Sequence, residues 1–181
     1  MRDLPQHKPV LAGTAYKGIS ESGVRLEALP EGHLLHVLGA IEPSVLAAEL
    51  VKAGFAKSSI RKAGFRQWFV AGDEPLAPAS FAALAAALAG KAFVMDQSHG
   101  RVRIGISGRS SRVLLSKGTA IDLDPTVFPE GHSVMTMVGH LSVQIARTGE
   151  DSFELTVLRS FAESLWGDLT HMAASAEKEG A

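Results

Sequence analysis

The fold is decided by one stretch near the middle of the chain, Asp96-Gln97-Ser98-His99-Gly100-Arg101-Val102-Arg103-Ile104-Gly105-Ile106-Ser107-Gly108. Its first five residues are mostly polar and end in glycine, which predicts a turn. From Val102 to Ile106 apolar residues alternate with other types, as is typical of a strand with one buried face. The pair Ser107-Gly108 then predicts the start of a helix over residues 109–116, which Gly118 ends.

Towards the C-terminus the pattern predicts three consecutive strands and a closing helix. Segments rich in Asp, Pro and Gly at residues 122–125 and 128–131 predict loops. The strands are expected over residues 133–138, 141–145 and 153–158, with a turn at residues 149–151. An amphipathic helix is expected from Phe161 to about Ala174, with Leu165, Leu169 and Met172 on its inner face.

Towards the N-terminus the pattern predicts a hairpin, two helices and two further strands. Strands at residues 24–29 and 33–38 are joined by Pro30-Glu31-Gly32, which predicts a hairpin. A helix begins at Pro43 and ends before Gly54, with Val45, Leu46, Leu50 and Val51 on one face. A strand at 65–70, a turn at 72–75, a helix at 78–89 and a short buried strand at 92–95 follow. The 78–89 helix is apolar almost all round, which is typical of a helix covered on more than one side.

These elements predict an α+β fold of two sequential βα lobes with antiparallel sheets. The lobes are expected over residues 10–95 and 96–176, in one compact unit spanning residues 1–181. No linker separates them, and residues 1–9 and 177–181 are expected to be flexible tails.

Composition excludes several classes of function. The formal net charge is −1, from 18 basic and 19 acidic residues, so no net field draws the chain to nucleic acid or to an anionic membrane. The absence of cysteine excludes disulfides, thiolate nucleophiles and cysteine-held metals, and it is compatible with the cytoplasm. No signal peptide or membrane-spanning run is predicted. Mean hydropathy of +0.13 with 20% charged residues indicates either an alanine-rich core or an apolar surface that meets a partner.

Histidines are the first candidates for a reactive site. His33 and His36 lie three apart in a predicted strand and therefore on opposite faces, which argues against a shared metal. His132 and His140 have no carboxylate at ligand spacing. Asp96, Ser98 and His99 offer an acid, a hydroxyl and an imidazole, but consecutive residues of a turn rarely converge as a triad does. A polar turn in which Asp96 or Ser98 bonds to backbone is the favoured interpretation.

The remaining candidates also have simple structural interpretations. Residues 105–111 open a helix and could hold an anion there, but the P-loop and dinucleotide signatures are missing, and a helix start with Ser107 as cap is favoured. Trp68 and Trp166 are expected in the core, although an interface role stays open. Arg101 and Arg103 share one face of their strand, where a solvated face is favoured over pairing with a partner's acids.

The second half resembles the gamma subunit of heterotetrameric sarcosine oxidase, and the first half does so more weakly. The resemblance lies in residues 96–108, Leu114-Leu115-Ser116-Lys117-Gly118, Ile121-Asp122-Leu123-Asp124-Pro125, Val127-Phe128-Pro129-Glu130-Gly131 and Leu158-Arg159-Ser160-Phe161-Ala162-Glu163-Ser164-Leu165-Trp166. It covers most of the chain, and residues 96–169 strongly. It implies a fold like the folate-binding domain of aminomethyltransferase, without that site.

The resemblance also implies a function within a complex of alpha, beta, gamma and delta subunits. Such a complex oxidises sarcosine to glycine, passes the one-carbon unit to tetrahydrofolate or releases formaldehyde, and forms peroxide. Its FAD, FMN, NAD and zinc are carried by the other subunits. The resemblance therefore implies a non-catalytic structural subunit, with no catalytic, cofactor-binding or metal-ligating residue of its own. A homodimer of the isolated chain stays open.

Two alternatives stay open. One is an independent tetrahydrofolate-binding, aminomethyltransferase-like protein, for which Asp96 is the only acidic candidate. The other is the equivalent subunit of an N-methylglutamate dehydrogenase. Folate-binding relatives that act in iron–sulfur maintenance carry a cysteine motif, which this chain lacks. Residues 78–89 and 1–9 are the first candidates for a surface that meets partners.

Overall fold

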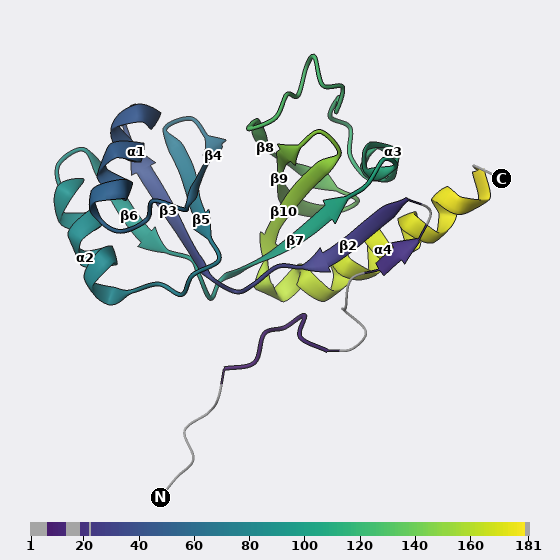
Figure 1. Ribbon diagram of the computed structural model, residues 1–181, viewed down its shortest axis with the longest axis horizontal. Helices are drawn as coiled ribbons and strands as arrows, with labels where there is room; N and C mark the ends of the chain where they lie inside the picture. The colour runs from purple at the N-terminus through teal and green to yellow at the C-terminus, as the bar shows by residue number, and fades with distance from the viewer. Residues whose placement is uncertain (1–6, 14–18, 22, 180–181) are drawn as a thin grey trace, which may run out of the picture.

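The computed structural model describes residues 7–13, 19–21 and 23–179, which form two antiparallel sheets with helices on their outer faces. The six-stranded sheet has the order β1-β2-β7-β10-β9-β8 and the four-stranded sheet the order β4-β5-β3-β6. Figure 1 shows the layers in sequence: α1 and α2, the four-stranded sheet, the six-stranded sheet, then α3 and α4. The predicted α+β class with antiparallel sheets is confirmed.

The bounds of the elements are as follows. The six-stranded sheet consists of β1 (Ile19–Glu21), β2 (Val24–Ala28), β7 (Arg101–Ser107), β8 (Ser133–Val138), β9 (Leu141–Gly149) and β10 (Ser152–Leu158). The four-stranded sheet consists of β3 (His33–Gly39), β4 (Ser59–Gly64), β5 (Gln67–Gly72) and β6 (Ala92–Asp96). The helices are α1 (Pro43–Lys52), α2 (Pro78–Ala87), α3 (Ser111–Ser116), the 3-10 turn η2 (Arg159–Phe161) and α4 (Ala162–Glu179). Among the described residues, no helix combines the length and apolarity needed to span a bilayer.

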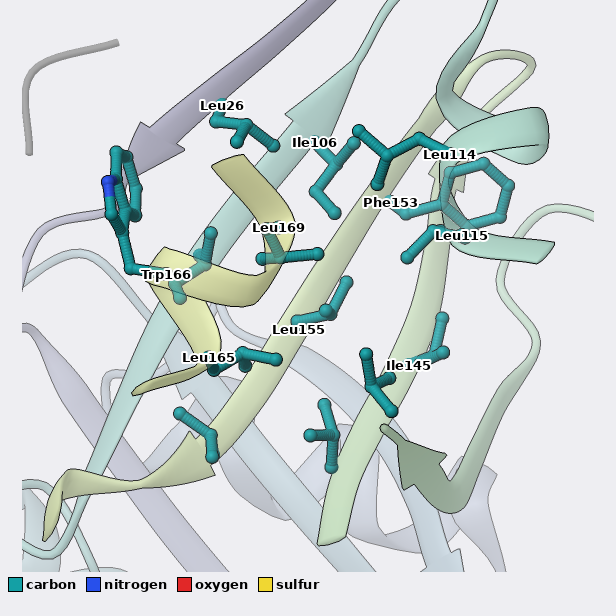
Figure 2. Packing of buried hydrophobic residues seen from close by; sticks show 14 of the residues in the cluster. Leu26, Ile106, Leu114, Leu115, Ile145, Phe153, Leu155, Leu165, Trp166 and Leu169 are labelled. Atoms are coloured by element: carbon teal, nitrogen blue, oxygen red, sulfur yellow. The ribbon is translucent and has the colours of Figure 1, made fainter. Parts of the chain in front are cut away.

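The larger core lies between the six-stranded sheet and the helices α3 and α4. Alternate residues of β7, Val102, Ile104 and Ile106, point into it, as their spacing predicts. Figure 2 shows Leu165, Trp166 and Leu169 of α4 lying over this face of the sheet. Full burial of a side chain of this kind contributes about 1.5–3 kcal/mol to the free energy of folding. The inner face predicted for the last helix is confirmed at Leu165 and Leu169, while Met172 is partly buried.

The smaller core lies between the four-stranded sheet and the helices α1 and α2. Leu46 and Leu50 of α1 and Leu84 of α2 are buried against the sheet. Each helix begins with a proline in its first turn, where the missing N–H has no helical partner to lose. Val45 and Val51, predicted on the inner face of α1, are instead 42% and 61% exposed.

The predicted hairpin of residues 24–29 and 33–38 is wrong. Both strands exist, but β2 pairs with β7 in one sheet and β3 pairs with β5 and β6 in the other. The chain crosses between the sheets at residues 29–32. A Cβ on Gly32 would lie 2.1 Å from the carbonyl oxygen of Gly72, so the crossing needs glycine. The two strands are therefore close in the sequence but do not pair with each other.

Three other predicted elements differ from the structure, and one strand was not predicted. The strand expected at 65–70 is β5, two residues later, and its hairpin partner β4 had no prediction. Arg66, in the left-handed region at φ 54°, forms the turn between them. The helix expected from 109 begins at Ser111, and Ser107 ends β7 rather than capping a helix. The strand at 92–95 is an edge strand and not a buried one, because Phe93 is 81% exposed. The strands at 133–138, 141–145 and 153–158 and the turn at 149–151 are confirmed.

The two lobes are nearly but not fully sequential. β3 to β6 complete the four-stranded sheet within residues 33–96, while residues 19–28 join the later strands in the six-stranded sheet. Of the expected flexible tails, residues 1–6 and 180–181 lie outside the described residues. His7 and Lys8 contact Glu31 and Arg159, and the helix α4 continues to Glu179.

Candidate functional site

The histidines of β3 are held by internal contacts on opposite faces of the strand, as predicted. The ring of His33 bonds through Nε2 to the hydroxyl of Ser58 at 2.7 Å and through Nδ1 to the carbonyl of Glu74 at 2.7 Å. His36 faces the other way, with Nε2 3.1 Å from Oε1 of Gln67 and its ring against Phe69. Burial, together with the nearby charge of Arg101, lowers the pKa of His36, although the bond to Gln67 opposes this.

Within residues 7–13, 19–21 and 23–179, no group of three or more His, Asp or Glu side chains is arranged to hold a metal ion. His132 and His140 are both exposed, and the ring of His132 packs edge-on against Phe128. Of the described histidines, His7 and His99 meet with ring centroids 5.1 Å apart, while His33, His36, His132 and His140 lie on separate parts of the fold.

The Asp96–Gly100 segment is a turn whose polar groups bond to the backbone, which confirms the favoured interpretation. Oδ1 of Asp96 accepts the N–H of Ser98 at 2.8 Å. The buried hydroxyl of Ser98 accepts the N–H of Leu34 at 3.1 Å. Because the hydroxyl closes the end of the β3–β6 ladder, it is not poised to act as a nucleophile on a substrate.

The segment after β7 is likewise fixed by close backbone contacts. At Gly108, φ is +115° and a Cβ would lie 2.0 Å from the carbonyl oxygen of Gly23. The hydroxyl of Ser111 donates to the carbonyl of Asp151 at 3.1 Å. The following helix α3 has six residues. These contacts favour the structural interpretation of this segment over an anion site.

A polar seam joins the two sheets, and no pattern in the sequence indicates it. The seam consists of Arg61 on β4, Asp73 after β5, Arg103 on β7 and Glu154 on β10. Both terminal nitrogens of Arg61 donate to the carboxylate of Glu154, one of them at 2.8 Å. Arg103 lies 3.6 Å from the same carboxylate and donates to Asp73 at 2.5 Å. The side chains of Arg61 and Glu154 are only 8% and 7% exposed.

The seam corrects the prediction of a solvated arginine face on β7. Arg103 is 7% exposed and also donates to the carbonyl oxygens of Pro30 and Gly72. Arg101 lies with its guanidinium 4.7 Å from the ring centroid of Phe69 on the facing sheet. The arginines lie on the face opposite Val102, as predicted, but this face meets the second sheet.

A cavity of about 370 Å³ lies beside the seam, between the sheets. It is lined by Lys57, Arg61 and Arg103 and by Glu27, Asp73 and Glu154, among others. Acidic and basic side chains are equal in number, so the cavity has no net charge to attract an ion. Its buried charges are already paired with one another, which gives it the character of a structural seam.

Glu31 forms a second junction, between the N-terminal segment, the sheet crossing and the start of α4. Its carboxylate accepts from Nε2 of His7 at 2.5 Å, from the N–H of Val10 at 3.1 Å and from Arg159 at 2.9 Å. Burial raises the pKa of Glu31, but the hydrogen bonds from His7, Arg159 and Val10 outweigh it and hold the pKa below its ordinary value.

Apolar side chains remain exposed on α2, which is one candidate for a surface that meets partners, and on β6. On α2 only Leu84 is buried, so within the described residues this helix is covered on one side, and Ala82, Ala83 and Ala86 are exposed. On β6, Phe93 and Met95 are 81% and 49% exposed. Of the tryptophans, Trp166 is 3% exposed in the larger core, as expected, and Trp68 packs at the margin of the smaller one.

Comparison with known proteins identifies relatives of this fold. A family model described as sarcosine oxidase, gamma subunit family matches residues 46–177. A chain of the heterotetrameric sarcosine oxidase from Corynebacterium sp. U-96, solved with pyrrole 2-carboxylate, aligns with a TM-score of 0.74 and 23% identity over 89% of each chain. No curated protein matches significantly.

A more distant likeness connects the fold to a larger enzyme. Aminomethyltransferase T of the glycine cleavage system from Bartonella henselae aligns with a TM-score of 0.58 and 17% identity, over 88% of this chain. The alignment covers 48% of that enzyme, so this chain spans about half its length. At this identity the likeness concerns the fold.

Proposed function

The chain belongs to the sarcosine oxidase gamma subunit family, and from this premise we propose that it serves as a non-catalytic structural subunit of a heterotetrameric sarcosine oxidase. The complex oxidises sarcosine to glycine in the cytoplasm, passes the one-carbon unit to tetrahydrofolate or releases formaldehyde, and forms peroxide. Alpha, beta and delta subunits carry FAD, FMN, NAD and zinc. The observation that carries the proposal is the family match over residues 46–177.

The contacts of the candidate reactive groups support the non-catalytic role. Ser98 and His33 are engaged in hydrogen bonds within the chain. Glu154, Arg61 and Arg103 are paired with one another between the sheets. A catalytic acid, base or nucleophile needs an atom that faces a substrate, and these side chains face their own chain.

Co-expression tests the proposal. The chain carries an affinity tag and is produced together with the products of its neighbouring genes. The expected result is a stable complex that oxidises sarcosine faster than N-methylglutamate. A tagged chain that captures no flavoprotein would refute the proposal, and a preference for N-methylglutamate would assign the chain to the related dehydrogenase.

An independent tetrahydrofolate-binding protein is the second candidate, favoured by the likeness to aminomethyltransferase T. Its acidic candidate is Asp96, which is exposed and whose Oδ1 accepts the N–H of Ser98. Calorimetry of the isolated chain with tetrahydrofolate, compared with Asp96→Asn, distinguishes the two. Binding that Asp96→Asn abolishes would favour this candidate, and no heat at millimolar folate would end it.

A further inference from the structure

We propose that the open edge of β6 is a docking site for an extended segment of a companion subunit, which adds to the four-stranded sheet as a fifth strand and places a carboxylate against Arg101. The inference rests on the proposed function, because it requires a companion subunit. It goes further by naming the surface, the mode of contact and the chemistry of the partner.

In the part of the chain that the structure describes, the edge of β6 lacks the features that normally protect a sheet edge. Such edges are usually blunted by a bulge, a proline, an inward-pointing charge or a covering segment. The opposite edge strand, β4, has a register shift between Lys62 and Gly64, and the carbonyl of Lys62 accepts from Ser133 and Gln144 of the other sheet. β6 reads Ala-Phe-Val-Met-Asp, shows no register shift and pairs, among the described residues, with β3 alone.

The ladder leaves the backbone groups of two residues of β6 directed outward. The N–H of Gln97 donates to the carbonyl of Leu34 on β3. In an antiparallel pair the groups of alternate residues face the partner strand. Phe93 and Met95 therefore bond towards β3, while the N–H and C=O groups of Val94 and Asp96 point away from the sheet. An added strand would satisfy these outward groups.

The exposed side chains of β6 form part of a larger apolar face. Phe93 lies beside Leu38, and Met95 lies beside His36, by the register of β3 and β6. His36 in turn packs against Phe69, whose ring centroid is 4.8 Å away. The six-stranded sheet covers this face at Phe69, which is 2% exposed, but leaves Phe93 81% exposed. An exposed aromatic next to an open strand edge is typical of an interaction site.

The charge on this face indicates the chemistry of the partner. The guanidinium of Arg101 stacks on Phe69, its buried Nε has no hydrogen-bond acceptor, and no described residue forms an ion pair with it. Burial lowers the pKa of Arg101. The one acid of β6, Asp96, already bonds to its own turn. In a second copy of this chain that carboxylate would be engaged through Oδ1 with its own turn, so an acidic segment of a different chain fits better.

Substitutions within the complex test the apolar contact. Phe93→Ser with Met95→Ser, in the full-length tagged chain, is expected to weaken capture of the companion subunits at least about tenfold. The control is Val51→Ser, which changes a valine of α1 that is 61% exposed. It is expected to leave capture unchanged. Arg101→Gln is expected to weaken capture more than Arg101→Lys, which keeps the charge.

A proline substitution tests strand addition itself. Val94→Pro removes an outward N–H and leaves the bonds to β3 intact, whereas Val94→Ala removes a similar amount of packing but keeps the N–H. Val94→Pro should lose capture and Val94→Ala should keep it. Hydrogen exchange provides a readout that does not depend on folding of a variant: the amides of Val94 and Asp96 should exchange fast in the isolated chain and slowly in the complex.

The outcomes separate this inference from the proposed function. Failure of the wild-type chain to capture any companion would overturn the proposed function. Capture that survives Phe93→Ser with Met95→Ser, with the amides of Val94 and Asp96 still fast, would overturn the docking site alone. Slow exchange of these amides in the isolated monomer, or self-association that the double substitution abolishes without affecting companion capture, would overturn it as well.

Discussion

Glu154 receives both terminal nitrogens of Arg61 from one sheet and lies 3.6 Å from Arg103 on its own. All three side chains are less than one-tenth exposed. Removing the negative charge alone would leave the buried Arg61 without a counter-charge, and Arg103 with only the exposed carboxylate of Asp73. Loss of one partner of a buried ion pair lowers the stability of the fold strongly, because the remaining buried charge has neither a counter-ion nor its hydration.

We expect Glu154→Gln to lower the free energy of unfolding by about 3–5 kcal/mol. Chemical denaturation of the isolated chain, followed by circular dichroism, measures the change. Asp73→Asn is the matched control, since Asp73 also meets Arg103 but its side chain is 68% exposed, and it should cost about 0–1 kcal/mol. Equal effects of the two substitutions would contradict the assignment of Glu154 as the centre of the seam.

Residue roles were predictable where they depend on near neighbours in sequence. The bonds of Asp96 and Ser98 to backbone follow from the chemistry of a turn. The partner of Glu154 was not predictable, because Arg61 is 93 residues away in the sequence. Other arginines of the chain are also next to apolar residues, so the sequence does not single out Arg61. A carboxylate between Phe153 and Leu155 indicates a polar face, but it does not reveal that a second sheet covers that face.

At the scale of elements, the crossing between the sheets depends on two glycines that nearly touch. A Cβ on Gly32 would meet the carbonyl oxygen of Gly72 at 2.1 Å, and backbone cannot move aside as a side chain can. We expect Gly32→Ala to lower the free energy of unfolding by about 1–3 kcal/mol or more, as overpacking does. Thermal unfolding of the variant checks this.

Gly167→Ala is the control for that substitution and a prediction in its own right. Gly167 lies within α4, and a Cβ there would meet no atom within 4 Å. Alanine restricts the unfolded chain and favours the helix, so the substitution should stabilise the protein by about 0.5–1 kcal/mol. A loss of stability here would show that the outer face of α4 is packed against part of the protein.

The sequence predicted elements better than their pairing. Periodicity located β7 to β10 and α4, because each has one face on the larger core. β4 was missed because a bulge and an inward arginine break its alternation. The false hairpin arose because a short Pro-Gly connection looks the same whether the chain turns back or crosses to another sheet.

At the scale of the whole molecule, Glu31 connects three segments that are far apart in sequence. Hydrogen bonds from His7, Val10 and Arg159 stabilise its charged form and lower its pKa, against the effect of burial. A lowered folded-state pKa adds stability that is present above the unfolded value of 4.5 and is lost as the pH falls through the folded-state pKa.

The pH dependence tests this junction. The difference in unfolding free energy between the wild type and Glu31→Gln should be constant above pH 4.5 and shrink below it. Arg159→Gln removes one donor and should move the pKa of Glu31 towards its ordinary value, as measured by NMR titration. A Glu31 titration unchanged by Arg159→Gln would show that the ion pair contributes little.

The α+β class and the antiparallel sheets were predictable for the whole molecule, while the arrangement of the lobes was not. Nothing in residues 19–28 indicates that their partner, β7, lies beyond the entire second sheet. The exposed edge of β6 was predicted as a buried strand, because its composition is that of a core. A surface adapted to a partner has the same residue types as an interior, so sequence alone does not separate them.

The pairing of β2 with β7 also orders the events of synthesis. Residues 33–96 contain every strand of the four-stranded sheet, and they leave the ribosome before β7 does. That sheet can close while β2 still lacks its neighbour, whose residues from Ile104 to Ser107 arrive some 80 positions later. The four-stranded sheet can therefore form before the six-stranded sheet, in which β2 stays unpaired on one side until β7 has been translated.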